Sequence, residues 1–179
     1  NAMVVVFGSI NLDLVARVPR IPAPGETIPG RTLATLPGGK GANQALAARA
    51  AGAAVALYGA VGADTFATAA LASLRAAGVA LDGVATLEAP TGVALINVAD
   101  DGENAITVIP GANALAQAAA VPDDLLARGV TLLMQLEVPV TEVASLAARA
   151  HARGATVVLN AAPAVALPDA ILPAVDVLI

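Results

Sequence analysis

A glycine-rich segment at residues 38–44, Gly-Gly-Lys-Gly-Ala-Asn-Gln, and the earlier triplet Asn11-Leu12-Asp13 hold the residues best suited to chemistry. Glycine has no Cβ, so its backbone can approach a ligand closely and adopt positive φ. Asn43 both donates and accepts hydrogen bonds, Lys40 is a cation, and Asp13 is a carboxylate that only accepts. Such a set suits a small ligand covered with hydroxyl groups, because each hydroxyl needs a donor and an acceptor. These residues therefore predict a polyol, most simply a sugar.

The glycine segment does not match the common nucleotide-binding loops. A Walker A loop needs a glycine at the position of Ala34 and a serine or threonine at the position of Gly41. No G-x-G-x-x-G fingerprint of a dinucleotide-binding fold follows the first apolar run either. An ordinary glycine-rich turn that leads into an alanine-rich helix near Gly41 explains the same residues equally well.

The composition limits the classes of partner. Hydrophobic residues make up 58% of the 179 residues, but prolines and glycines interrupt the long apolar stretches, and a spanning helix needs ~20 consecutive apolar residues. A net charge of −5 and 2% aromatic residues disfavour nucleic acid, whose binding depends on basic and stacking side chains. The absence of cysteine fits a reducing compartment. We therefore expect a soluble, cytoplasmic protein that binds neither nucleic acid nor a membrane.

Short β-branched runs alternate with stretches of helical periodicity. Strands are expected at residues 4–8, 55–59, 131–136 and 156–159, and helices at 41–51, 65–77 and 141–153. Asp64 and Thr141 are placed to cap the second and third helices. A glycine follows each helix, at Gly52, Gly78 and Gly154. This alternation predicts an α/β fold with a doubly wound, mostly parallel sheet and helices on both faces.

Two regions, residues 14–36 and 91–110, break this alternation. The first contains strand-like pieces separated by prolines, and the second is a β-hairpin with Asp100, Asp101 and Gly102 at its tip. Such strands can pair into a separate small β-sheet. Because the first region lies between the two polar segments, we expect this sheet to act as a lid that excludes water from a transfer reaction. A simple decoration of the main sheet is the alternative.

Nine segments of the chain resemble, in order, those of the ribokinase-like (PfkB) family of carbohydrate kinases. They are Gly8–Asp13, Pro22–Thr27, Gly38–Ala45, Gly59–Asp64, Thr91–Ala94, Gly102–Asn104, Pro110–Asn113, Met134–Glu137 and Asn160–Pro163. The resemblance extends over essentially the whole chain. It implies a ribokinase-like fold and an ATP-dependent phosphotransferase that acts on the primary hydroxyl group of a sugar.

The resemblance also implies site residues. The sugar would be held by Asn11, Asp13, Gly39, Lys40, Gly41, Ala42, Asn43 and Glu137, and Asn160 would lie near the phosphate or metal. Glu137 would orient the sugar rather than act as a base. No carboxylate in this sequence matches the catalytic base of the family, and no metal ligand is assigned. Ala161 stands where the family usually has proline, which loosens that loop slightly.

The resemblance further implies the reaction and its cofactors. D-Ribose and ATP would give D-ribose 5-phosphate and ADP, with Mg²⁺ and a monovalent cation, K⁺, and the lid would pair two subunits into a homodimer. A kinase for fructose, a nucleoside or a keto-deoxy sugar acid is an alternative, as is a non-catalytic sugar-binding or dimerisation fragment. The catalytic base, nucleotide site and cation site of the family would follow Ile179. We therefore expect residues 3–179 to be the N-terminal part of the domain.

Overall fold

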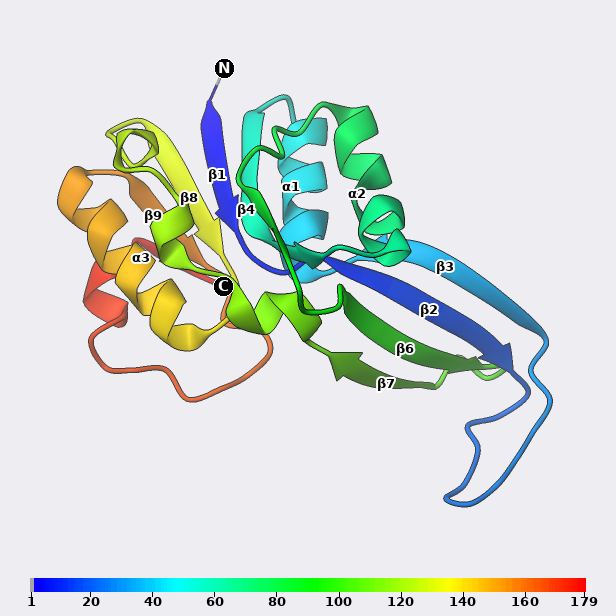
Figure 1. Ribbon diagram of the computed structural model, residues 1–179. Coiled ribbons are helices and arrows are strands. Elements are labelled where there is room, and N and C mark those ends of the chain that lie inside the picture. The colour runs from blue at the N-terminus through cyan, green and yellow to red at the C-terminus, as the bar shows by residue number, and fades with distance from the viewer. Residues whose placement is uncertain (1) are drawn as a thin grey trace.

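In the computed structural model, which describes residues 2–179, a six-stranded parallel sheet forms the body and a four-stranded sheet projects from it (Figure 1). In the order in which they pair, the strands of the large sheet are β10 (Val177–Leu178), β9 (Thr156–Leu159), β8 (Val130–Met134), β1 (Met3–Phe7), β4 (Ala54–Gly62) and β5 (Val84–Leu87). All of the pairings between these strands are parallel. The predicted α/β class, with its mostly parallel sheet, is therefore confirmed.

Helices cover both faces of the large sheet, as predicted. Helices α1 (Lys40–Ala50) and α2 (Thr65–Ala77) lie on one face, and α3 (Val140–Arg153) lies on the other (Figure 1). The 3-10 turns are η1 (Gly111–Leu115), η2 (Ala118–Ala120), η3 (Asp123–Leu125) and η4 (Leu172–Ala174). Within residues 2–179, no helix has both the length and the apolar character needed to cross a membrane.

The side chains of the central strands alternate between two hydrophobic cores. In β1, Val5 and Phe7 join the core under α3, while Val6 joins the core under α1 and α2. Successive side chains of a strand point to opposite faces, so a strand covered on both sides needs apolar residues at every position. This requirement explains the uninterrupted Val-Val-Val-Phe run of β1.

The projecting sheet, here called the small sheet, contains both regions that break the α/β pattern. Its strands pair in the order β3 (Thr32–Gly38), β2 (Asn11–Val18), β6 (Gly92–Ala99) and β7 (Asn104–Ile109). Strands β2 and β6 are parallel, and the other pairings are antiparallel. The predicted hairpin is confirmed in β6 and β7. Strand β2 begins at Asn11, so the polar triplet belongs to the small sheet (Figure 1).

One of the two predicted helix caps is present. The Asp64 carboxylate accepts a hydrogen bond from the Ala67 N–H at the start of α2 (2.9 Å). The expectation for Thr141 is wrong, because α3 begins at Val140 with Pro139 in the capping position and no side-chain cap. The Pro139 carbonyl already accepts from Glu142 and Val143, which places the exposed Thr141 inside the first turn.

Asp64 also ties the small sheet to the body. Its Oδ1 accepts a hydrogen bond from the Thr91 hydroxyl (2.7 Å), and its Oδ2 accepts one from the Thr91 N–H (2.9 Å). The same hydroxyl accepts a hydrogen bond from the Gly62 N–H at the end of β4 (2.9 Å). Thr91 directly precedes β6, so one carboxylate fixes the start of α2, the end of β4 and the root of the small sheet.

We predict that Asp64→Ala destabilises the protein more than Thr141→Ala does. The first change removes a helix cap, which typically lowers the free energy of unfolding by about 0.5–2 kcal/mol, together with the bonds to Thr91. The second change removes a hydroxyl that caps nothing and serves as the control. Urea unfolding of both variants measures the difference. Equal midpoints for the two variants would contradict the roles given to these side chains.

Candidate functional site

Two adjoining pockets lie where the carboxyl ends of the central strands meet the small sheet. Their volumes are about 550 Å³ and about 170 Å³. The residues that line both are Asn11, Lys40, Ile106, Val108 and Glu137. In open parallel sheets, ligands bind at the carboxyl ends of the strands. The position of the pockets therefore makes them the candidate site.

The smaller pocket gathers most of the predicted site residues. Its lining comprises Asn11, Asp13, Gly39, Lys40, Asn43, Ala94, Ile96, Ile106, Val108 and Glu137. Two predicted residues, Gly41 and Ala42, are not part of it and lie buried beneath the turn. Their N–H groups donate to the Oγ (3.3 Å) and the carbonyl oxygen (2.9 Å) of Ser9. They thus hold the glycine turn against the chain that leaves β1.

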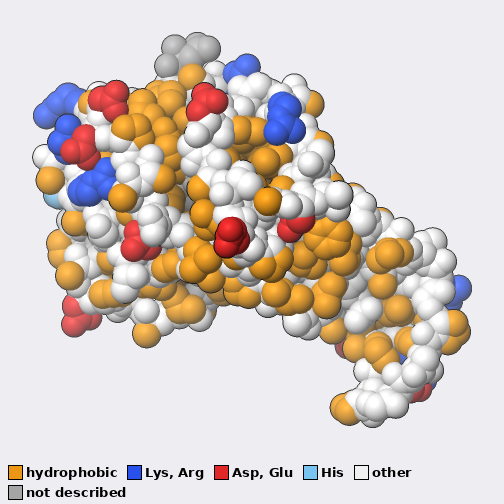
Figure 2. All heavy atoms as spheres, viewed as in Figure 1, with side chains coloured by type: hydrophobic (Ala, Val, Ile, Leu, Met, Phe, Trp, Pro, Cys, Tyr) orange, Lys and Arg blue, Asp and Glu red, His pale blue; other side chains and the backbone are white. Residues whose placement is uncertain are grey.

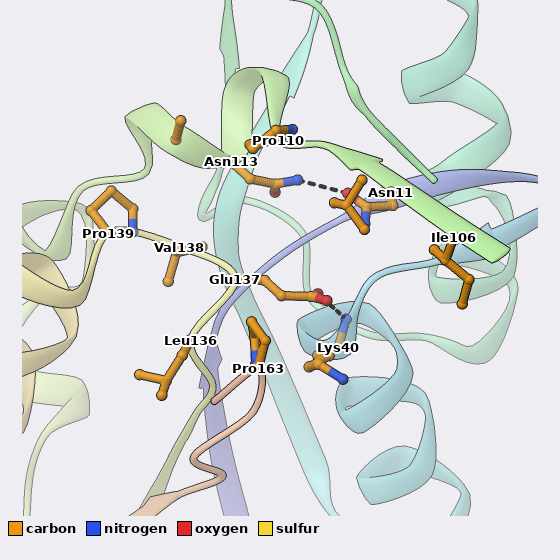
Figure 3. Close-up of a pocket in the computed structure, with 12 residues that line it drawn as sticks. Asn11, Lys40, Ile106, Pro110, Asn113, Leu136, Glu137, Val138, Pro139 and Pro163 are labelled. Carbon is orange, nitrogen blue, oxygen red and sulfur yellow. Dashed lines mark hydrogen bonds between the residues drawn. The ribbon is translucent and has the colours of Figure 1, made fainter. Parts of the chain in front are cut away.

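Glu137 connects three segments at the floor of the site. It follows β8, and its Oε2 accepts hydrogen bonds from the Ser9 hydroxyl (2.5 Å) and from the N–H of Lys40, the first residue of α1 (2.9 Å). Figure 3 shows its side chain extending toward the start of α1. A carboxylate is stabilised at a helix N-terminus by the orphan N–H groups and the helix dipole. Both bonds use Oε2, which leaves Oε1 free of them.

The glycine turn is shaped by two close approaches. Gly39 has a φ of 91°, a conformation that side chains other than glycine rarely adopt, and it turns the chain from β3 into α1. At Gly38, which pairs with Asn11 across the β2–β3 ladder, a Cβ would overlap both carboxylate oxygens of Asp13, two positions farther along β2. The absence of a side chain at Gly38 therefore makes room for the carboxylate that faces the pocket.

The surroundings of Asp13 raise the pKa of its carboxyl group. Burial is the main cause and raises the pKa of this carboxyl above its ordinary value of 3.8, and the nearby charge of Glu137 raises it further. Desolvation and a like charge both disfavour ionisation. A ligand that donates hydrogen bonds to Asp13 would oppose both effects, so the site is suited to hydroxyl groups.

Asn11, which lines both pockets, contacts Asn113, which lines the larger one. The Asn113 amide nitrogen donates to the Asn11 Oδ1 (2.8 Å), as Figure 3 shows. Asn113 also brackets the backbone of Ile10, because its Oδ1 accepts from the Ile10 N–H (2.9 Å) and its Nδ2 donates to the Ile10 carbonyl (3.1 Å). Both asparagines are buried. Asn113 thus fixes both the start of β2 and the Asn11 side chain.

Sequence reasoning gave no role to Ser9 and Asn113, although both lie in segments that resemble the family. Ser9 is fully buried and bonds to Glu137, which is 128 positions away. Asn113 is 103 positions from Ile10. No spacing rule joins residues so distant in sequence. The available signal was chemical: Ser9 follows a strand at its carboxyl end, where polar side chains of parallel sheets converge.

Asn160 follows β9 at the same edge of the sheet. Its N–H donates to the Met134 carbonyl (2.9 Å), and its side chain belongs to the lining of neither adjoining pocket. Among residues 2–179, no group of three or more histidine, cysteine or acidic side chains is arranged to hold a metal ion.

Comparisons with known proteins agree with the resemblance seen in the sequence. The chain is 39% identical over 176 residues to the ribokinase of Haemophilus influenzae, covering 97% of this chain and 58% of that protein. It is 40% identical over 173 residues to the ribokinase of Schizosaccharomyces pombe, covering 92% of this chain and 54% of that protein. The chain therefore spans little more than half the length of these curated relatives.

A solved structure shows the same fold. The Arabidopsis thaliana ribokinase complexed with ribose and ATP superposes with a TM-score of 0.87 at 33% identity, covering 99% of this chain and 60% of that one. The family model for the pfkB family carbohydrate kinases matches residues 1–179. This chain belongs to the pfkB family of carbohydrate kinases.

Proposed function

We propose that the protein containing this chain is an ATP-dependent sugar kinase that converts D-ribose and ATP into D-ribose 5-phosphate and ADP. The observation that carries this proposal is the pocket of about 170 Å³, in which Asn11, Asp13, Lys40, Asn43 and Glu137 surround one small space. The relatives named ribokinase support the choice of ribose. Because the chain spans little more than half of their length, the activity is a proposal for the complete protein.

The chemistry of the pocket fits a ligand with several hydroxyl groups. Asp13 can accept from two neighbouring hydroxyls, whereas Lys40 and Asn43 can donate. A wrong sugar would leave buried polar groups without partners, at a cost of about 1–3 kcal/mol each. We propose Asn11, Asp13, Gly39, Lys40, Asn43 and Glu137 as the residues that contact the sugar. Gly41 and Ala42 contribute indirectly, because their bonds to Ser9 hold the glycine turn in place.

Phosphoryl transfer moves the terminal phosphoryl group of ATP to the primary hydroxyl oxygen of the sugar and releases the hydroxyl proton. Enzymes promote it by positioning the reactants and stabilising charge. ATP, Mg²⁺ and K⁺ are the cofactors that we propose for the complete protein, with Asn160 near the phosphate or metal. We assign no catalytic base to this chain. The role proposed for these 179 residues is to bind and orient the sugar and to shield it from water.

We predict that the complete protein releases ADP from ATP, in the presence of Mg²⁺ and K⁺, faster with D-ribose than with fructose, adenosine or no sugar. Asp13→Asn should lower kcat/KM for ribose about 10–100-fold, because hydrogen bonds to a charged group contribute about 1.5–3 kcal/mol each. The KM for ATP should stay unchanged.

The matched control is Asp82→Asn, which neutralises an exposed carboxylate outside both pockets. Turnover of another sugar in preference to ribose would overturn the substrate. An Asp13→Asn enzyme with an unaltered kcat/KM for ribose would remove Asp13 from the site.

The charge of Asp13 yields a second prediction. Its carboxylate form accepts the sugar hydroxyls, and its pKa lies above 3.8 because of burial and the charge of Glu137. Glu137→Gln removes the charge but keeps an oxygen for Ser9 and Lys40. The pKa of Asp13, followed by carbon NMR of the carboxyl group, should therefore fall yet remain above 3.8, because burial is the larger cause. Glu88→Gln, at an exposed position, is the control, and identical Asp13 titrations in both variants would contradict the prediction.

We propose that the small sheet is the lid of the site and that its pocket-facing side pairs with a second copy in a homodimer. Cross-strand pairing on that side forms two rows across the sheet, one of Leu36, Asp13, Ala94 and Val108 and the next of Ala34, Val15, Ile96 and Ile106. Leu36, Ile106 and Val108 are exposed by 51%, 55% and 46%. A contiguous exposed apolar surface of this kind marks an interaction site. Figure 2 shows hydrophobic side chains on the projecting part of the molecule.

We predict that Ile106→Glu shifts the complete protein from dimer to monomer, because the new charge would be buried in the interface. Leu33→Glu is the matched control: Leu33 is 69% exposed but lies on the opposite side of the small sheet, since its neighbour Ala34 pairs with Val15. Sedimentation velocity measures both. Dissociation by the control alone, or by neither variant, would contradict the proposed interface.

A further inference from the structure

The Asn113 side chain has only one amide orientation that satisfies its neighbours. An N–H group donates and a carbonyl oxygen accepts, so the atom facing the Ile10 N–H must be the Asn113 oxygen and the atom facing the Ile10 carbonyl must be its nitrogen. The two ends of a side-chain amide are told apart by the hydrogen bonds that they make. The peptide group of Ile10, whose N–H and carbonyl are fixed by the backbone, therefore determines which end of Asn113 is the oxygen.

This orientation determines that of Asn11. The Asn113 nitrogen donates at 2.8 Å to the Asn11 side chain, so the contacted atom must be the Asn11 oxygen. The Asn11 amide nitrogen, with two N–H donors, is then the end that remains for a ligand. Asn11 is only 3% exposed and lines both pockets. A ligand in either pocket can therefore accept hydrogen bonds from this nitrogen.

A third residue makes room for this contact. Gly92 begins β6 and pairs with Asn11 across the β2–β6 ladder. A Cβ on Gly92 would overlap both the Asn113 nitrogen and the Asn11 oxygen. The two amide groups can therefore meet only because position 92 has no side chain. The contact therefore depends on the residue types at three positions that are far apart in the sequence, namely 11, 92 and 113.

We propose that Asn113 is a positioning residue that makes Asn11 a hydrogen-bond donor toward the sugar. Asn11 then supplies donors on one side of the pocket while Asp13, two positions along β2, supplies only acceptors. A hydroxyl between them would accept from Asn11 and donate to Asp13. The site would select a sugar with a hydroxyl at that place and reject the corresponding deoxy sugar. This inference rests on the proposed sugar kinase function.

The test is a double-mutant cycle on the complete protein. Asn113→Asp keeps an acceptor for the Ile10 N–H but, once ionised, cannot donate to Asn11, whose amide would then turn its oxygen to the pocket. At pH 8 the KM for D-ribose should rise about tenfold or more, as for one lost hydrogen bond inside a protein, with the KM for ATP unchanged. In an Asn11→Ala background, Asn113→Asp should have at most about a twofold further effect, because coupled residues are not additive.

The pH dependence separates positioning from simple damage to the fold. Protonation of the introduced carboxyl restores one donor, so the KM of Asn113→Asp for ribose should improve between pH 8 and pH 6. The same improvement should be absent in the Asn11→Ala background, whereas a merely structural defect would improve in both. Gln117→Glu adds the same charge at an exposed position of the same segment and is the control. If Asn113→Asp does not fold, Gly92→Ala should produce the same rise in KM and the same coupling to Asn11→Ala.

The outcomes distinguish this inference from the proposed function. Additive effects of the Asn11 and Asn113 changes, in an enzyme that turns over ribose, would overturn the role of Asn113 alone. The absence of turnover by the unmodified protein with D-ribose, fructose and adenosine would overturn the proposed function and this inference together.

Discussion

The site depends on one carboxylate oxygen, the Oε2 of Glu137, which two donors share. The Ser9 hydroxyl comes from the chain that leaves β1, and the Lys40 N–H begins α1. The segment after β8, the segment between β1 and β2, and the glycine turn are thereby held together at one point. A carboxylate at a helix N-terminus is favourable in itself. Burial raises the pKa of the neighbouring Asp13 carboxyl, and the charge of Glu137 raises it further. The residue that assembles the site thus also places a second carboxylate beside Asp13, which gives the site an excess of acceptors.

That excess has a consequence for ligand choice. Asp13 and Glu137 both line the smaller pocket, whereas Lys40 is its cationic residue. Carboxylates accept hydrogen bonds, and hydroxyl groups can donate them without carrying charge. An anionic group in the same place would meet two like charges, which disfavour it. The pocket is therefore suited to the neutral, hydroxyl-rich part of a substrate.

Local patterns in the sequence were enough to predict the large sheet and its helices. The run Val-Val-Val-Phe of β1 is apolar at every position because helices cover both faces, and Asp64 was recognisable as a cap from its place before α2. Thr141 was misplaced because Pro139 occupies the capping position and α3 begins at Val140. A residue that fits a cap by type is overruled when the helix is capped two residues earlier.

The polar contacts of the site were beyond local patterns. The glycine turn and Asp13 were identified from residue type, but the bracket that Asn113 forms around Ile10 joins positions 103 residues apart. Such a contact exists only after β2 has paired with β6 and η1 has packed behind them. Residue type indicated the ligand class, whereas the orientation of the donors required the folded chain.

Strand β2 combines two surfaces through its period of two. The side chains of every second residue, Asn11, Asp13 and Val15, lie on the same side of the small sheet. Their partners on β3 are, in order, Gly38, Leu36 and Ala34. The side is polar where the strand leaves the body and apolar farther out. The polar end suits the proposed sugar, and the apolar end suits the proposed second subunit. Because one strand carries both, a movement of the small sheet would displace Asn11 and Asp13 together with the apolar surface, and closure would be coupled to binding.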